Sequence, residues 1–267
     1  MIPAEELVKL ILVRFLRPLL ASTTYTVRHG LAKGLKRKGG LGFFPFPSSL
    51  SKEERCLVGL NLSGATVYDV GGYEGIYTIF FARAVGVTGK VVTYEPNPIN
   101  QDKIRKNIAV NNFHNVYLRP IGLGRARQRE KLAYFASDPG TGSVEPRIKS
   151  KILQGGAADI VEVEIDSLDN EIVSQGLPKP DFIKVDVEGL EVDVLQGMSE
   201  TLRKYKPALF IEMHGVDDPA KGENAHKVIN ILTDYKYTFH HVESGKTVTL
   251  ENVFDAMRGH IYCSGFS

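Results

Sequence analysis

The sequence predicts an α/β fold with a doubly wound, mostly parallel sheet that is covered by helices on both faces. Apolar runs typical of buried strands alternate with segments of helical periodicity over about 200 residues. A glycine-rich turn joins the first such strand to the helix that follows it. Acidic residues stand at the ends of several strands, where parallel sheets of this type bind ligands.

The regular pattern begins after a Pro-rich stretch at residues 43–54. Runs rich in β-branched and aromatic residues predict strands, and apolar residues spaced three or four apart predict helices. Strands are expected at 66–70, 91–95, within 115–124, and at 129–136, 159–165, 181–187, 207–214, 235–242 and 259–265. Helices are expected at 75–86, 98–111, 167–176, 189–205 and 222–234. The stretch 137–159 is rich in Gly, Ser and charge, and it is interpreted as a long binding loop in which Thr141 and Ser143 could contact a substrate.

The N-terminal extension, residues 1–60, has a different pattern from the rest of the chain. Segment 5–20 has one apolar helix face, formed by Val8, Ile11, Leu12, Phe15 and Leu19, and Pro18 kinks or ends this helix. Lys9, Arg14 and Arg17 interrupt this apolar run, so it is too short to cross a membrane. A basic cluster follows at residues 28–38. Residues 1–40 either pack on their own domain or make a peripheral contact with an anionic membrane.

Composition excludes several classes of protein. Hydrophobic residues make up 43% and charged residues 24%, as in globular and unlike disordered proteins. The formal net charge of +2 gives no general attraction to nucleic acid, which is not an expected partner. Cys56 and Cys263 are far apart, so neither a disulfide framework nor a structural zinc site is expected, and a cytoplasmic location fits best.

The glycine turn after the first strand predicts a nucleoside site. Gly71 and Gly75 allow tight backbone geometry and the close approach of a ligand. The dinucleotide fingerprint GxGxxG started at Gly71 fails at Tyr73 and at Ile76, and no phosphate loop follows. Glu95, at the end of the next strand, can accept hydrogen bonds from both ribose hydroxyls. A nucleoside without phosphates fits this arrangement best.

Four ordered blocks carry a family resemblance. They are the stretch 67–98, NIAVNNFHNV, DFIKVDVEGLEVDVLQGM and KPALFIEMHG, and in this order they resemble the FkbM family of S-adenosylmethionine-dependent methyltransferases. The resemblance implies a Rossmann-like, seven-stranded class I methyltransferase fold over residues 61–267. It also implies that Asp69, Gly71 and Gly75 line the methionine part of S-adenosylmethionine and that Glu95 binds its ribose. The family often has Ala-Asn where this chain has Gly72 and Tyr73, a change expected to alter the shape of the cofactor pocket.

Ionisable groups at two neighbouring strand ends are the candidate catalytic residues. Asp186 and Glu188 follow one strand, and Glu212 and His214 end the next, so all four are expected to converge. His214 or Asp186 could act as general base, with Glu188 orienting the substrate. A divalent metal held by Asp186, Glu188 and His214 is an alternative that no matched motif demands. An ion-pair network of Lys184, Asp186 and Glu188 that braces the edge of the sheet is another.

The expected activity is O-methylation of a small molecule or a glycan. The word oxygen comes from the family resemblance, since the residues themselves predict only a nucleoside site beside acids. An NAD(P)-dependent oxidoreductase is the first alternative, disfavoured by the broken fingerprint. A non-catalytic nucleoside-binding module docked on a membrane is the second. His240, His241 and His260 are expected to be structural.

Overall fold

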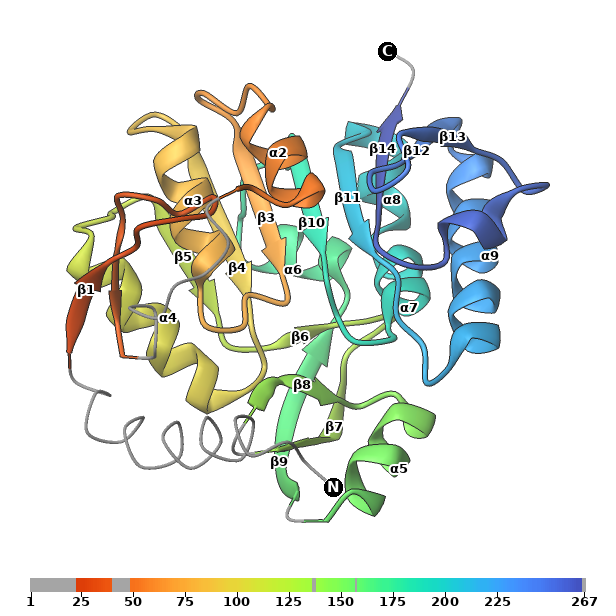
Figure 1. Cartoon of the computed structure of the whole chain (residues 1–267), viewed down its shortest axis with the longest axis horizontal. Helices are drawn as coiled ribbons and strands as arrows, with labels where there is room; N and C mark the ends of the chain where they lie inside the picture. Colours follow the sequence, from red (N-terminus) through yellow and green to blue (C-terminus); the bar gives the residue numbers. More distant parts are fainter. Residues whose placement is uncertain (1–22, 40–48, 136–137, 157, 266–267) are drawn as a thin grey trace.

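The computed structural model describes residues 23–39, 49–135, 138–156 and 158–265 (Figure 1). The predicted amphipathic helix at 5–20 lies outside these residues. In the part of the chain that is described, no helix is both long and apolar enough to cross a membrane.

The central sheet confirms the predicted α/β architecture. Its strand order is β13-β12-β14-β11-β10-β3-β4-β5. Strands β5, β4, β3, β10 and β11 pair in parallel, whereas the β11–β14, β14–β12 and β12–β13 pairings are antiparallel. The bounds are β3 Thr66–Val70, β4 Lys90–Tyr94, β5 Val116–Arg119, β10 Phe182–Val185, β11 Ala208–Glu212, β12 Tyr237–His241, β13 Lys246–Val248 and β14 His260–Gly265. Seven of these strands were expected, and the three-residue β13 adds an eighth at the edge.

Successive residues of each strand face opposite sides of the sheet, so the sheet has one hydrophobic core on each face. Val67, Val91 and Phe182 pack with Leu57 of α2 and with the aromatic face of α3. Their neighbours Tyr68, Val92 and Ile183 pack on the other face with helices α7, α8 and α9. The helix bounds are α2 Lys52–Val58, α3 Ile76–Val85, α4 Pro98–Val110, α6 Leu168–Ser174, α7 Glu191–Gln196, α8 Ser199–Tyr205 and α9 Asp218–Asp234, with a 3-10 turn η1 at Val253–Ala256. This two-sided burial is what a doubly wound sheet requires.

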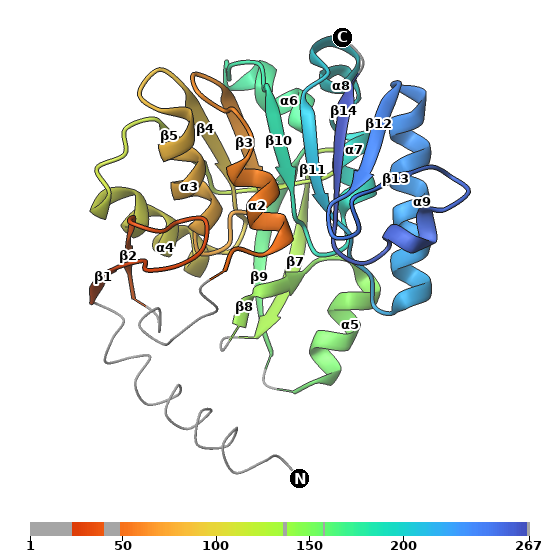
Figure 2. The ribbon, with the colours of Figure 1, turned by 45° about the horizontal axis from the view of Figure 1, so that its top comes forward.

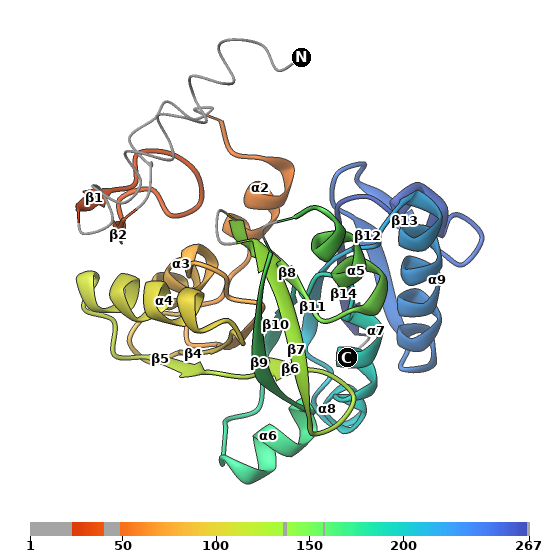
Figure 3. The ribbon, with the colours of Figure 1, turned by 90° about the horizontal axis from the view of Figure 1, so that it is seen from below.

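A second sheet corrects the expectation of a long loop at 137–159. Its order is β6-β9-β7-β8, with β6 Gly122–Leu123, β7 Gln128–Phe135, β8 Asp138–Ser143 and β9 Ala158–Asp166, and helix α5 Pro146–Gln154 connects β8 to β9. Figure 2 shows these strands beneath the carboxyl ends of β3, β4, β10 and β11, and Figure 3 shows the same sheet from below. The predicted loop is therefore mostly a strand and a helix.

The helix expected at 189–205 is two helices, because Gly197 separates α7 from α8. A Cβ atom at Gly197 would lie 1.9 Å from the backbone oxygen of Gly124, so the chain passes too close to the second sheet for a side chain. The described part of the extension packs on the domain. In it the hairpin β1 Thr24–Thr26 and β2 Lys36–Lys38 is hydrogen-bonded to α4 through Asn107 and Asn111.

Candidate active site

A cavity of about 280 Å³ lies between the carboxyl ends of the central strands and the second sheet. Gly71, Glu95 and Asp186 line it from the loops after β3, β4 and β10. The opposite wall comes from the second sheet and includes Leu132 and Ser143. The volume is close to the lower end of the range for ligand pockets, which is roughly 300–1,000 Å³.

The glycine turn is shaped by contact with a neighbouring strand. Gly71 has a φ of +87°, and a Cβ atom there would lie 1.7 Å from the backbone oxygen of Asp186. The amides of Gly71 and Gly72 both donate to the backbone oxygen of Tyr94. A Cβ atom on Gly75 would meet Ile104 of α4 at 3.1 Å. Close packing within the protein, rather than a ligand alone, therefore requires these glycines.

The structure divides the six predicted cofactor residues into two groups. Gly71, Tyr73 and Glu95 line the cavity, whereas Asp69, Gly72 and Gly75 are not among its lining residues. Asp69 is fully buried and accepts a hydrogen bond from the Thr78 hydroxyl. Burial, offset in part by the charge of Lys184, raises the pKa of Asp69 to about 6. Asp69 thus supports the turn from behind.

Glu95 is held in place by backbone and side-chain donors. Its Oε2 accepts from the Tyr73 amide at 2.8 Å, and its Oε1 accepts from the Asn97 amide at 2.9 Å and from Asn100 Nδ2 at 3.3 Å. Burial raises the pKa of Glu95 to about 7, against the opposing effect of these hydrogen bonds. The buried Nδ2 of Asn97, which also lines the cavity, has no hydrogen-bond partner among the described residues. A ligand that combines hydroxyl donors with an acceptor fits this end of the cavity.

Two contacts join the second sheet to the cavity. A Cβ atom at Gly140 would lie 2.6 Å from the ring of Tyr73, so the ring lies directly against β8. The Ser143 hydroxyl donates to the backbone oxygen of Glu188 at 2.7 Å and accepts from the Glu145 amide. Ser143 therefore connects the wall of the cavity to the loop that carries Asp186 and Glu188. The side chain of Thr141 lies outside the described residues.

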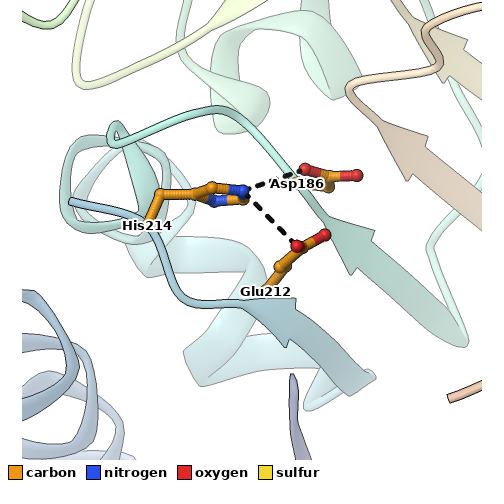
Figure 4. A group of neighbouring side chains, drawn as sticks. All are labelled: Asp186, Glu212 and His214. Atoms are coloured by element: carbon orange, nitrogen blue, oxygen red, sulfur yellow. Dashed lines mark ion pairs between the residues drawn. The ribbon is translucent and has the colours of Figure 1, made fainter. Parts of the chain in front are cut away.

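The four predicted catalytic groups converge, as the ends of two adjacent parallel strands require. His214 Nε2 lies 3.6 Å from Glu212 Oε1, 3.7 Å from Asp186 Oδ1 and 3.8 Å from Glu188 Oε1. Figure 4 shows the His214 ring directed toward Asp186 and Glu212. Asp186 Oδ2 accepts from Lys184 Nζ at 2.8 Å, so the predicted ion pair is also present.

Sequence reasoning missed Glu191, which orients His214. Glu191 is fully buried at the start of α7, and its Oε1 lies 2.8 Å from His214 Nδ1. Asn224 Nδ2 donates to the other oxygen of Glu191 at 2.7 Å and to the His214 backbone oxygen. A glutamate at an apolar helix position of the stretch LEVDVL was the only available signal.

Burial and neighbouring charges give the candidate bases of this cluster different pKa values. Burial lowers the pKa of His214, but the hydrogen bond to Glu191 and the neighbouring carboxylates outweigh it and raise the pKa to about 9. Burial also raises the pKa of Glu188 to about 7, despite the opposing charge of His214. The charges of His260, His214 and Lys184 overcome burial and hold the pKa of Glu212 well below its usual range. A pKa of about 9 favours the protonated form of His214 near neutral pH, so these pKa values favour Glu188 over His214 as proton acceptor.

The predicted structural histidines include one that contacts this cluster. His260 Nδ1 lies 2.7 Å from Glu243, and its Nε2 lies 3.4 Å from Glu212 Oε2. His241 Nε2 lies 2.7 Å from the backbone oxygen of Arg258. Both histidines are buried, so each braces the antiparallel part of the sheet.

Comparisons with known proteins show the family to which this chain belongs. The family model of the methyltransferase FkbM domain matches residues 69–239, more than half of the chain. Methyltransferase sdnD of Sordaria araneosa is 28% identical over 162 residues, which are 52% of this chain and 62% of that protein. Hexuronic acid methyltransferase AglP of Haloferax volcanii is 26% identical over 153 residues, 57% of each chain.

These matches cover less than two thirds of the length of either relative. A crystal structure of methyltransferase FkbM from Methylobacillus flagellatus KT is also similar, with a TM-score of 0.48 and 19% identity. That alignment covers 77% of this chain and 45% of the other.

Proposed function

Because this chain belongs to the FkbM methyltransferase family, we propose that it transfers a methyl group from S-adenosylmethionine to a hydroxyl of a small molecule or a glycan. One observation carries the proposal. The same cavity is lined by Glu95, which is suited to a ribose, and by Asp186 and Glu188, which are suited to an acceptor. Cofactor and acceptor could therefore meet within it.

Glu95 and Asn97 fit the nucleoside part of S-adenosylmethionine. Ionised Glu95 would accept hydrogen bonds from both ribose hydroxyls, and Asn97 Nδ2 is a buried donor that still needs a partner within the described chain. Gly71 and the ring of Tyr73 would contact the methionine part. When bound, S-adenosylmethionine supplies an electrophilic methyl group on a positively charged sulfur.

Asp186 and Glu188 fit an acceptor hydroxyl. Glu188 lines the cavity, and its raised pKa of about 7 suits a general base that accepts the hydroxyl proton near neutral pH. Asp186, paired with Lys184, would orient the acceptor. A sugar acceptor is suggested by the relative described as a hexuronic acid methyltransferase.

Calorimetric titration with S-adenosylhomocysteine and, separately, with NADH tests the cofactor. We expect S-adenosylhomocysteine alone to bind, and Glu95→Gln to weaken binding roughly 10- to 100-fold, because a charge-assisted hydrogen bond contributes about 1.5–3 kcal/mol. Glu162→Gln, an exposed change on β9, is the matched control and should leave the affinity unchanged. Binding of NADH, or equal affinities in the two variants, would contradict the proposal.

A further inference from the structure

We propose that Asp186, Glu212 and His214 form a binding site for one divalent cation of the Mn²⁺ type. Among the described residues, these three form a group in which one ligand atom from each lies within 4.8 Å of the others. The alternative raised by the sequence combined Asp186, Glu188 and His214, and the geometry replaces Glu188 with Glu212. The role of the cation rests on the proposed function, whereas the binding site itself does not.

The three ligand atoms face one another without forming hydrogen bonds. His214 Nε2 lies 3.7 Å from Asp186 Oδ1 and 3.6 Å from Glu212 Oε1 (Figure 4). Both distances are longer than a hydrogen bond. Adjacent ligands of an octahedral ion with bonds of ~2.1 Å lie about 3 Å apart. An ion would therefore draw these atoms together by less than 1 Å in each of the two measured pairs.

The remaining atom of each side chain is already engaged by a second residue. His214 Nδ1 faces Glu191, Asp186 Oδ2 accepts from Lys184, and Glu212 Oε2 lies 3.4 Å from His260 Nε2. A carboxylate on the far nitrogen of a histidine is the usual second partner of a metal ligand, because it fixes the ring and directs the other nitrogen at the ion. Glu191 is itself held by Asn224 and by the Gly189 amide. The group is thus a mixed nitrogen and oxygen set with fixed orientation rather than a patch of surface acids.

The donor set and its location indicate both the type of ion and its role. His214 loses its Nε2 proton when the ion binds, and the imidazole nitrogen and two carboxylate oxygens then form a mixed donor set open to Mn²⁺. Three protein ligands leave coordination positions open. Asp186 and Glu212 line the cavity, so the open positions face the acceptor. A hydroxyl bound there would lose its proton more readily to Glu188. The new oxygen–carbon bond forms as the sulfur–carbon bond breaks, and the sulfur keeps that electron pair and becomes a neutral thioether.

Titration of the full chain with Mn²⁺ tests the site. Binding is monitored by electron paramagnetic resonance, as the loss of the signal of the free ion. We expect one ion per chain, with Kd raised at least about tenfold by Glu212→Gln and by Asp186→Asn, and by a similar factor in Glu191→Gln. Glu162→Gln is the control, and a thermal unfolding scan of each variant checks that it is folded. Absence of binding, or an unchanged Kd in both ligand variants, would overturn the inference.

Calorimetry with S-adenosylhomocysteine on the same samples separates the two proposals. Retained S-adenosylhomocysteine binding in a protein that takes up no Mn²⁺ would remove the cation site and leave the proposed function intact. Specific Mn²⁺ uptake in a protein that does not bind S-adenosylhomocysteine would support the cation site and contradict the proposed function.

Discussion

Gly71 lies where the turn after β3 meets the loop that carries Asp186. Its missing side chain lets the turn after β3 rest on the backbone of Asp186, and its φ of +87° lies in the left-handed region. The two loops therefore share one contact at which no side chain fits.

Gly71→Ala is expected to lower the free energy of unfolding by about 3 kcal/mol or more, because it adds both left-handed strain and an overpacked contact. Gly176→Ala is the matched control, since Gly176 also has a positive φ but open space around it. Only the strain of about 1–2 kcal/mol applies to the control. Urea unfolding of the two variants measures the difference, and equal losses would show that the contact with Asp186 is unimportant.

Glu95 is expected to make cofactor binding depend on pH. Its pKa is raised to about 7, so its ionised fraction falls as the pH drops through neutrality. Only the ionised carboxylate accepts from both ribose hydroxyls, and the affinity for S-adenosylhomocysteine should therefore fall up to about tenfold from pH 8 to pH 6. Calorimetry at a series of pH values measures this. Glu95→Gln should show a much flatter profile, and an equally steep profile in that variant would assign the effect to another group.

The location of a site residue could be predicted from the sequence where the order of the strands alone decides it. Asp186, Glu188, Glu212 and His214 converge because β10 and β11 are parallel neighbours. Glu191 could not be found in this way, since it reaches His214 only through the packing of α7 between β10 and α9. The separation of Asp69 from the cavity depends on the exact path of the turn, which no sequence pattern describes.

At the level of elements, the second sheet forms the outer wall of the cavity, and β8 contributes Gly140, Gly142 and Ser143 to it. Ser143 attaches this wall to the loop after β10 through its hydrogen bond to Glu188. Ser143→Ala removes that bond and the one from the Glu145 amide, at a cost of about 1 kcal/mol each. We expect the Glu145 amide to exchange faster with deuterium, as measured by hydrogen-exchange mass spectrometry.

The control for this variant is Ser150→Ala, an exposed change on α5. It should leave exchange at Glu145 unchanged. Similar acceleration in both variants would mean that the wall is not attached through Ser143.

Elements with strong periodicity were predicted from the sequence, and those that depend on distant partners were not. The seven main strands and the helices after β3 and β4 follow from their apolar patterns. Strand β8 has the sequence DPGTGS, which is typical of a turn and becomes a strand only because β7 offers its edge. The strand expected at 159–165 was found, but strand alternation could not assign it to a second sheet.

At the scale of the whole molecule, helix α2 belongs to the same core as the central sheet. Leu57 is fully buried against Phe81 and Phe182, although it lies inside the expected extension 1–60. Leu57→Ala should therefore lower the free energy of unfolding by about 2–5 kcal/mol while unfolding remains a single transition.

Val58→Ala on the same helix is the control, since Val58 is 48% exposed and should cost little. Urea unfolding followed by both fluorescence and circular dichroism measures the two variants. A second transition, or no difference between Leu57→Ala and Val58→Ala, would make α2 an independent appendage.

The second sheet and α5 come from one continuous stretch of chain, residues 122–166, whereas Glu95, Asp186 and Glu212 come from the central sheet. Natural variation can therefore change the outer wall within one segment, provided that the contacts of Gly140 with Tyr73 and of Ser143 with Glu188 are kept. Exchanging this stretch between relatives is a direct route to chimeric enzymes with new acceptors. In evolutionary terms, the outer wall and the ionisable cluster lie on different segments of the chain, so each can accumulate substitutions at its own pace.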